Sequence, residues 1–489
     1  MRDPEKLSVP IRLERSPSAP LQEQLVDQLR TAIDTGRLAP GARMPSTRTM
    51  SSVLQVSRGV VVAAYEVLFA HGYVTGRTGS GTYVSASSRR EERTGHLAPT
   101  LPDPAPRRPP PLPATAVRML PDLPSPEGFP LAAWRAAWRD AGHRQPPADE
   151  PPPAGLPELR HAIAAHLRDS RGPLPDGHEV IVAAGYGHAV QLILLALGKR
   201  PVIGLENPAP APVRTALSRH GTVLPVPVDG AGARVDLVPA ACDVLVVMPD
   251  RGEPLGTRMT PERRKEVAAW AARRGTIVIE PAFDGVFDAR LSPQPGLMAV
   301  SDPSLAVMVG TFCDVLTPAL RLAFIVAPRF LAAAIEELIA AGREQPPYPS
   351  QQAAATLLTS GCVSRRVDRL SALYAPRRAL VAEALGVFPR ASLLGADSGS
   401  AATLVLPDGI RAEVVARALR ERQVQVAELS RYHHPAGPYG NGLVIGHGHL
   451  EELTLRRALR VVVRTLVEHG LARRGGPVHM LGLTGKVVN

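Results

Sequence analysis

The strongest constraint on the fold of this 489-residue chain is an alternation of apolar runs and helical stretches between residues 179 and 326. Six short runs rich in β-branched residues have the length of buried strands: 179–184, 201–205, 243–248, 276–279, 305–309 and 322–326. Helical patterns separate most of them: 188–197, 210–220 and 261–274. Such alternation predicts an α/β domain with a mainly parallel sheet, covered on both faces, whose ligands lie at the carboxyl ends of the strands. A smaller subdomain with strands at 402–406 and 424–428 is expected to follow residue 350.

A separate unit precedes this domain. Apolar residues recur every four positions in its first segment, which predicts an amphipathic helix that ends near Gly36: Leu21, Leu25, Leu29 and Ile33. Ser46 and Ser57 are typical N-caps, and they predict helices over 47–54 and 58–70. Two short strands, 73–75 and 81–84, flank a glycine-rich turn. Three helices followed by a hairpin predict a winged helix-turn-helix.

This unit resembles the GntR-type regulators in four stretches, 38–48, 56–58, 64–68 and 72–84. The resemblance implies binding to a double-stranded DNA operator. Arg58 falls in the first turn of the recognition helix, where a guanidinium can bond guanine O6 and N7 or hold a phosphate. Helix N-termini capped by serine also suit phosphate oxygens, and a wing arginine suits the minor groove. The expected DNA-binding residues are Ser46, Arg48, Ser57, Arg58, Gly59, Arg77 and Gly79. Taken singly, the arginines could equally be solvated surface charges.

A stretch dense in proline and arginine, 86–121, separates the two units. Proline at this density favours an extended, semi-rigid spacer. The predicted organisation is a DNA-binding domain over 12–85, this linker, an α/β domain over 122–472 and a disordered tail over 473–489.

The large domain resembles class I/II aminotransferases of fold type I, in the arrangement of the MocR subfamily of GntR regulators. The segments 129–134, 154–164 and 310–321 carry this resemblance. It implies pyridoxal phosphate as the family cofactor. It also implies a homodimer that places two DNA readers on paired half-sites.

Several residues that the family uses to hold the cofactor are replaced in this chain. Asp314 stands at the position of the imine-forming lysine. Pro281 replaces the acid that pairs with the pyridinium nitrogen. Phe283 and Pro210 replace two tyrosines, one that touches the cofactor oxygen and one that stacks on the ring. An aspartate cannot form an imine, and pyridoxal chemistry needs that amine.

Other parts of the expected effector pocket are kept. The turn Gly185, Tyr186 and Gly187 precedes a helix N-terminus, which is a natural anion site. Thr311 and Arg321 match the family's phosphate-binding hydroxyl and arginine, and Arg251 and His188 could add basic contacts to a ligand. One hypothesis is that Asp314 now pairs with Arg321 and fills the old site. The alternative is that Arg321 makes some other structural ion pair.

These residues predict a DNA-binding regulator with no catalytic residues and no covalent cofactor. Its aminotransferase-like domain would then serve dimerisation, effector sensing or both. Two alternatives stay open: a regulator that binds pyridoxal phosphate non-covalently as its effector, and a pyridoxal-phosphate-dependent aminotransferase.

The charge, the cysteines and the hydropathy bear on the partners and the compartment of the protein. The net charge of +11 permits a polyanionic partner without naming one. The three cysteines, Cys242, Cys313 and Cys362, lack metal-ligand spacing, so we expect no metal site and a reducing compartment. No stretch approaches ~20 apolar residues and the first residues lack a signal pattern. The expectation is a soluble cytoplasmic protein without a membrane partner.

Overall fold

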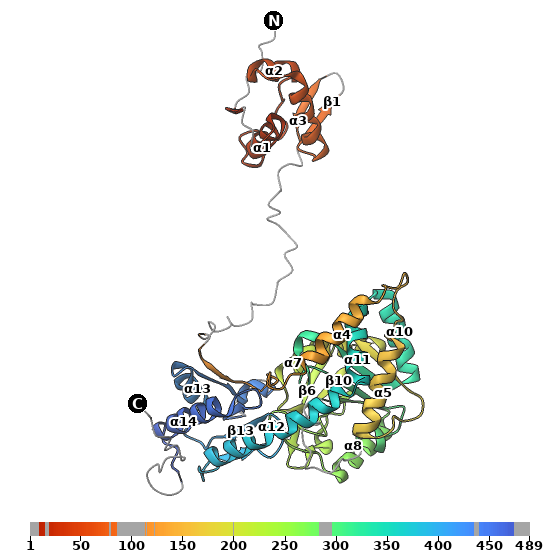
Figure 1. Ribbon diagram of the computed structural model, residues 1–489, viewed down its shortest axis with the longest axis vertical. Helices are drawn as coiled ribbons and strands as arrows, with labels where there is room; N and C mark the ends of the chain where they lie inside the picture. Colours follow the sequence, from red (N-terminus) through yellow and green to blue (C-terminus); the bar gives the residue numbers. More distant parts are fainter. Residues whose placement is uncertain are drawn as a thin grey trace. The chain divides into compact units, whose positions relative to one another are not determined.

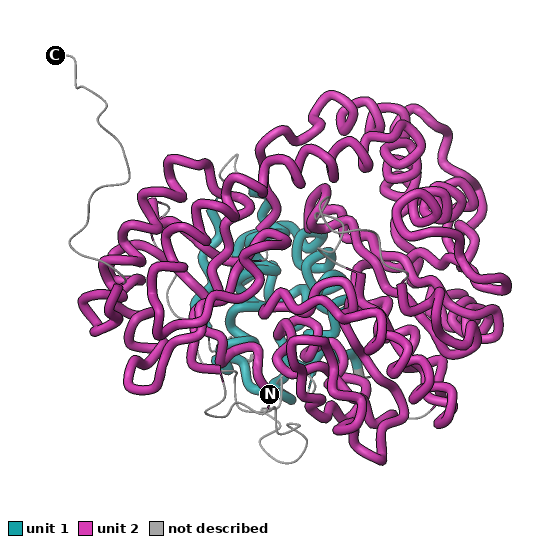
Figure 2. Tube along the Cα trace, turned by 90° about the horizontal axis from the view of Figure 1, so that it is seen from below, with its two compact units in different colours: residues 1–110 teal, residues 111–489 magenta. Residues whose placement is uncertain are grey.

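The computed structural model describes residues 9–14, 19–77, 80–85, 113, 115–121, 123–198, 200–282, 296–434 and 440–473. The chain divides into two compact units, Met1–Pro110 and Pro111–Asn489, which Figure 2 colours separately. Most of the proline-rich stretch, residue Phe283 and the tail from 474 onward lie outside the described residues.

The first unit is a three-helix domain with a hairpin. Its elements are α1 Leu21–Asp34, α2 Thr47–Leu54, α3 Arg58–Ala70, β1 Val74–Arg77 and β2 Gly81–Val84. Leu25 and Leu29 of α1 are fully buried and share one core with Val61 and Leu68 of α3. The Tyr65 hydroxyl donates to the carbonyl oxygen of Pro45 at 2.9 Å and so links α3 to the segment before α2. The predicted winged helix-turn-helix is confirmed.

The second unit contains an eight-stranded sheet in the order β4-β11-β10-β9-β8-β5-β6-β7. The strands are β4 His178–Ala183, β5 Val202–Asn207, β6 Thr222–Asp229, β7 Gly232–Ala233, β8 Val244–Val246, β9 Ile277–Ala282, β10 Ala306–Thr311 and β11 Ala323–Pro328. The five strands from β10 to β6 in this order run parallel, whereas β11 and β7 are antiparallel to their neighbours. The predicted mainly parallel α/β sheet is confirmed.

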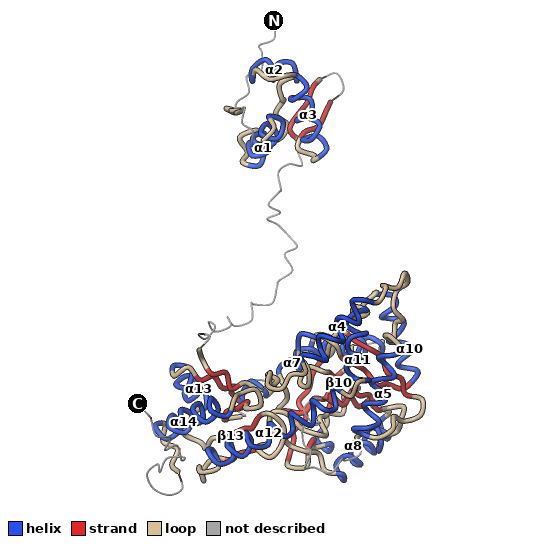
Figure 3. The backbone as a smooth tube through the Cα atoms, viewed as in Figure 1, coloured by secondary structure: helices blue, strands red, loops and turns tan. Residues whose placement is uncertain are grey.

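Helices cover both faces of this sheet (Figure 3). The covering elements are α4 Leu131–His143, α5 Pro157–Arg171, α6 Tyr186–Ala196, α7 Ala211–Ser218, α8 Pro261–Arg274, α9 Leu297–Val300, α10 Arg329–Gly342, α11 Tyr348–Thr359 and α12 Cys362–Leu385. Successive residues of β4 serve different cores: Val180 and Val182 pack with α5 and α11, whereas Ile181 packs with α6 and α10. Side chains alternate between the two faces of the sheet, and both faces are buried. Each strand is therefore apolar at every position.

A smaller lobe completes the unit. Its sheet has the order β12-β13-β15-β14-β3, from β3 Val117–Met119, β12 Ser392–Leu394, β13 Ala401–Val405, β14 Val424–Glu428 and β15 Gly442–Gly446. Two helices, α13 Ala412–Glu421 and α14 Glu452–Glu468, share its core with the end of α12. Figure 1 shows α12 extending toward β13, so this helix connects the two lobes.

The sequence pattern misses β6. This strand contains Pro225 and Pro227, which cannot donate to a strand ladder and so argue against a strand. β6 nevertheless pairs in parallel with β5 over six residues, from Thr222 to Pro227. The short 3-10 turns Val235–Leu237, Pro318–Leu320 and Leu429–Tyr432 were likewise not predicted.

No helix in the described part of the chain is long and apolar enough to cross a membrane. Within the same residues, no three His, Cys, Asp or Glu side chains gather in a way that could hold a metal ion.

Candidate functional site

The N-termini of α2 and α3 present the residues that the sequence assigns to DNA. The Ser46 hydroxyl accepts a hydrogen bond from the Thr49 N–H at 3.1 Å, and the Ser57 hydroxyl accepts one from the Val60 N–H at 3.4 Å. Arg58 is the first residue of α3, and Arg48 lies in the first turn of α2. All four side chains are exposed, as is Gly59. This edge of the domain can therefore offer two capped helix ends and two guanidiniums to a polyanion.

The outward face of α3 contains a residue that the sequence analysis missed. Val61, Ala64, Tyr65 and Leu68 are buried, so the opposite face of this helix is free for base edges. Glu66 lies two turns beyond Arg58 and is exposed. A carboxylate at this position can accept a hydrogen bond from cytosine N4. The four-residue spacing of positions 58, 62 and 66 places them on one helix face, and this spacing could have identified Glu66 from the sequence.

The structure describes the wing, which is the hairpin of β1 and β2, only in part. Arg77 is the last residue of β1, which pairs in antiparallel register with β2 from Val74–Val84 to Arg77–Gly81. Gly79 lies outside the described residues.

Replacing Ser57 by alanine should lower the stability of α3 by about 1 kcal/mol, because the substitution removes the cap on the Val60 N–H. Hydrogen exchange of the amides over 58–61 should therefore become faster in the S57A protein. Exposed Ser52 inside α2 provides the matched control, since it is not a cap. Equal protection in S57A and S52A would contradict the capping role.

In the second unit, the glycine-rich turn and Arg321 lie near each other. Gly185 precedes α6 with φ of +95°, and a Cβ built at Gly185 would lie 4.0 Å from the Arg321 carbonyl oxygen. Gly187 is part of the first turn of α6. Tyr186 is partly buried, and burial raises the pKa of its phenol. The His188 imidazole accepts a hydrogen bond from the Ala184 N–H at 3.0 Å through Nδ1, and its Nε2 lies 3.3 Å from a Glu344 oxygen. His188 thus orders the turn.

Thr311 and Asp314 line a different recess, beneath α5. Its other lining residues are His166, Leu167, Ser170, Arg171, Ala282, Phe312, Val315, Phe324 and Val363. Arg321 does not line this recess. Its side chain is exposed, and its backbone has a φ of +53°. The pairing of Asp314 with Arg321 stays a prediction.

Arg251 also differs from the expectation of an open basic residue. Its side chain is buried, and it donates from Nη2 to the Ala401 carbonyl oxygen at 2.7 Å and from Nη1 to Glu253 at 3.4 Å. It therefore connects the loop after β8 to the small lobe. Pro281 lies within β9, opposite Val309, and Pro210 is the residue before α7.

A buried ion network that the sequence did not reveal lies next to the recess. Arg171 Nη1 contacts Asp250 at 2.6 Å and Glu280 at 2.9 Å, and Arg264 contacts Asp250 at 3.1 Å. Burial opposes ionisation of Asp250, but Arg171 and Arg264 outweigh it and lower the pKa of this carboxyl group. Burial and the neighbouring Asp250 raise the pKa of Glu280. The network joins α5, α8 and two strand ends around the site.

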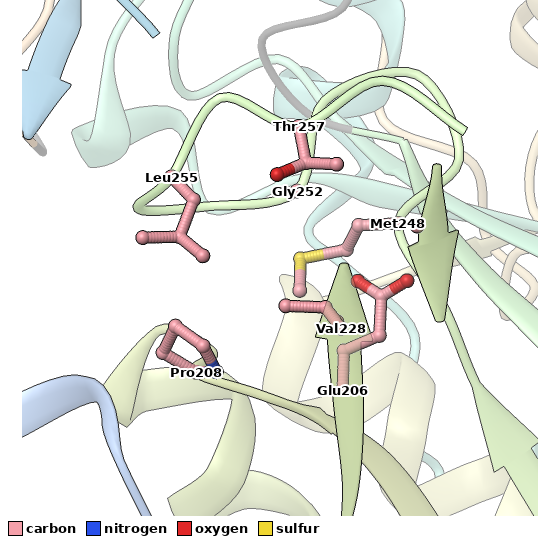
Figure 4. Close-up of a pocket in the computed structure, with 8 residues that line it drawn as sticks. Glu206, Pro208, Val228, Met248, Gly252, Leu255 and Thr257 are labelled. Atoms are coloured by element: carbon pink, nitrogen blue, oxygen red, sulfur yellow. The ribbon is translucent and has the colours of Figure 1, made fainter. Parts of the chain in front are cut away.

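A second, smaller pocket lies at the ends of β5, β6 and β8, and Figure 4 shows it. Glu206 lines it together with Met248 and Thr257, and the carboxyl group is buried. Burial raises the pKa of Glu206 to about 7. None of the residues expected in the cofactor pocket lines it.

Comparison with known proteins identifies both units. Residues 21–84 match the model of bacterial regulatory proteins of the gntR family, and residues 122–437 match that of aminotransferase class I and II. The pyridoxine biosynthesis transcriptional regulator PdxR of Corynebacterium glutamicum is 32% identical over 460 residues, which cover 92% of this chain and 97% of the relative. The probable rhizopine catabolism regulatory protein MocR of Rhizobium meliloti is 28% identical over 465 residues, covering 91% and 94%.

Solved structures agree for the second unit. The multiple substrate aminotransferase of Thermococcus profundus superposes with a TM-score of 0.66 at 20% identity, covering 73% of this chain and 92% of that one. This likeness concerns the fold, which is one that binds pyridoxal phosphate in its family. Because both units match and a relative aligns along nearly the whole length, the chain belongs to the MocR-type, GntR-related transcriptional regulators, DNA-binding proteins that join a winged helix-turn-helix to an aminotransferase class I and II domain.

Proposed function

We propose that this regulator uses its aminotransferase-like domain for dimerisation and effector sensing and that this domain does not catalyse transamination. The observation that carries the proposal is the aspartate at position 314, which lines the recess beside Thr311. When bound, pyridoxal phosphate would supply imine chemistry, and that chemistry requires an amine.

The residues present do not fit covalent pyridoxal phosphate. Lys265 is the sole lysine in the described ranges, and it is exposed on α8. Pro281 offers no carboxylate to a pyridinium nitrogen. The Asp314 carboxylate would repel a phosphate held by Thr311. These features support a domain without the family's chemistry.

In the DNA-binding domain, we assign base contacts to Arg58 and phosphate contacts to Ser46, Arg48, Ser57 and Arg77. A homodimer would place two such domains on paired half-sites. An effector can change the spacing of these domains only if it binds the two arrangements with different affinity.

Incubation with pyridoxal phosphate followed by borohydride reduction tests the proposal. We expect no visible aldimine absorbance and no adduct in the peptide that contains residue 314. Lys265→Arg is the control, because any adduct on the exposed lysine of α8 should disappear in that variant. An adduct that survives in K265R and maps to the second unit, or measurable amino transfer, would refute the proposal.

Non-covalent binding of pyridoxal phosphate as an effector is the second candidate. The backbone of Arg321 passes near the Gly185 turn. This favours the second candidate, since a helix N-terminus and an arginine are groups that suit a phosphate. A calorimetric titration distinguishes the two. Saturable binding that Arg321→Gln weakens at least tenfold would establish this candidate, and no heat of binding would exclude it.

A further inference from the structure

The outer face of α14 carries a row of arginines. The inner face of this helix is fixed in the core of the small lobe, where Leu455, Val462 and Leu466 are fully buried. Exposed residues recur every three or four positions on the opposite face: Leu453, Arg457, Arg460, Arg464 and Val467. Residues at these spacings are neighbours along one side of a helix. The three central residues, Arg457, Arg460 and Arg464, are called the arginine stripe below.

The acidic residues of α14 leave the arginine stripe largely uncompensated. They pair with other arginines, Glu452 with Arg456 at 2.8 Å and Glu468 with Arg422 at 2.6 Å. The stripe itself makes one longer contact, of 3.8 Å between Arg464 and Glu468. Its other two members have no ion pair among the residues that the structure describes. Like charges three and four residues apart destabilise a helix, and a bound polyanion would remove this repulsion.

Most of the net positive charge of the protein lies outside the DNA-binding domain. Residues 1–85 contain 10 basic and 7 acidic side chains, whereas the whole chain has a net charge of +11. The first unit therefore supplies only a small part of the general electrostatic attraction to DNA. Basic residues elsewhere in the chain can add to this attraction, because phosphate contacts depend on charge and not on base sequence.

The arginine stripe belongs to the lobe at which the chain from the DNA-binding domain enters the second unit. β3 is the first strand of this unit, and it pairs with β14 at the edge of the small sheet. The Val117 N–H donates to the Gln423 carbonyl oxygen at 2.8 Å. The preceding residue, Arg422, pairs with Glu468 of α14. DNA held by the first unit is thus tethered through the chain to the lobe that carries α14.

We propose that the arginine stripe is a second DNA-contacting surface, which binds the phosphate backbone of the DNA molecule that the winged helix-turn-helix reads. Each guanidinium would donate charge-assisted hydrogen bonds to phosphate oxygens. Such contacts carry no sequence information, so the stripe raises the affinity for operator and for other DNA alike. An acidic face of another protein is the competing occupant, and DNA is favoured because the first unit already brings DNA to this chain.

Salt titration of DNA binding by the full-length protein tests the proposal. Each phosphate contact contributes about 0.9 to the negative slope of log affinity against log salt concentration on duplex DNA. The variant R457Q/R460Q/R464Q should therefore lower this slope by about 2–3 for each stripe that is engaged. Its affinity for operator DNA and for a scrambled duplex of the same length should fall by the same factor. Glutamine keeps the helix propensity of these exposed positions, and the corresponding lysine triple should retain the wild-type slope because it retains the charge.

The matched control removes the same charge from three exposed arginines of α4 and α5: Arg135, Arg139 and Arg168. This control variant should keep the wild-type slope. An unchanged slope in the stripe variant, or an equal decrease in both triple variants, would overturn the proposal. The loss of operator preference on changing Arg58 is a separate measurement, so the two DNA contacts can fail independently. If the stripe variant does not fold, R460Q alone, which should lower the slope by about 0.9, decides.

Discussion

Replacement of Arg58 by alanine is expected to abolish selective operator binding. Arg58 is exposed at the first residue of α3, the end of a recognition helix that reaches base edges. A bidentate arginine–guanine contact contributes about 1–3 kcal/mol, or roughly 5- to 150-fold in affinity. In a dimer that reads two half-sites, the loss in free energy would double. The measurement is a footprint and a titration on operator DNA, repeated on a scrambled sequence.

The control for this experiment is Arg30→Ala. Arg30 is an exposed arginine on α1 in the same domain, paired with Asp27 at 3.0 Å. Both variants remove one positive charge, so both lose the same general attraction to the polyanion. Only R58A should lose the difference between operator and scrambled DNA. A footprint that is unchanged in R58A would refute the assigned contact, provided that the variant retains the wild-type helical content.

The first unit could be predicted almost completely from the sequence because local interactions determine its elements. Ser46 and Ser57 bond the N–H groups of their own first turns, so the starts of α2 and α3 could be read from the caps. The four-residue spacing of Leu21, Leu25 and Leu29 likewise gave α1. In the large sheet, local patterns located the strands that are apolar runs. They failed at β6, which contains prolines but is held in the sheet by its pairing with β5.

The arrangement of the candidate site was less predictable because it depends on contacts between distant segments. Arg251 and Ala401 are 150 residues apart, and Arg171 and Glu280 are 109 residues apart. No local pattern reports such contacts. The Asp314–Arg321 pair stays a prediction for a related reason, because the backbone at Arg321 has a positive φ that depends on the turn as a whole.

Replacement of Arg171 by methionine should destabilise the second unit by about 3–5 kcal/mol at pH 8. This change roughly keeps the volume, and it leaves Asp250 with Arg264 and Glu280 with the Leu297 N–H as partners. Removing one member of a buried ion network leaves uncompensated charge, which costs more than the intact network contributes. All three tryptophans of the chain, Trp134, Trp138 and Trp270, belong to the second unit. Their fluorescence during urea unfolding therefore reports on that unit alone.

The pH dependence of this loss separates a charge effect from a packing effect. Without Arg171, the pKa of Asp250 in the folded protein should rise, and the pKa of Glu280, which burial and Asp250 already raise, should rise further. A raised carboxyl pKa gives stability that is present in acid and is lost as the pH rises through the folded pKa. The deficit of R171M should thus shrink between pH 8 and pH 5. A second change, Glu280→Gln, should recover part of the stability at pH 8, because it removes one of the two buried charges. A deficit that is equal at both pH values and unaffected by E280Q would mean that Arg171 acts through packing.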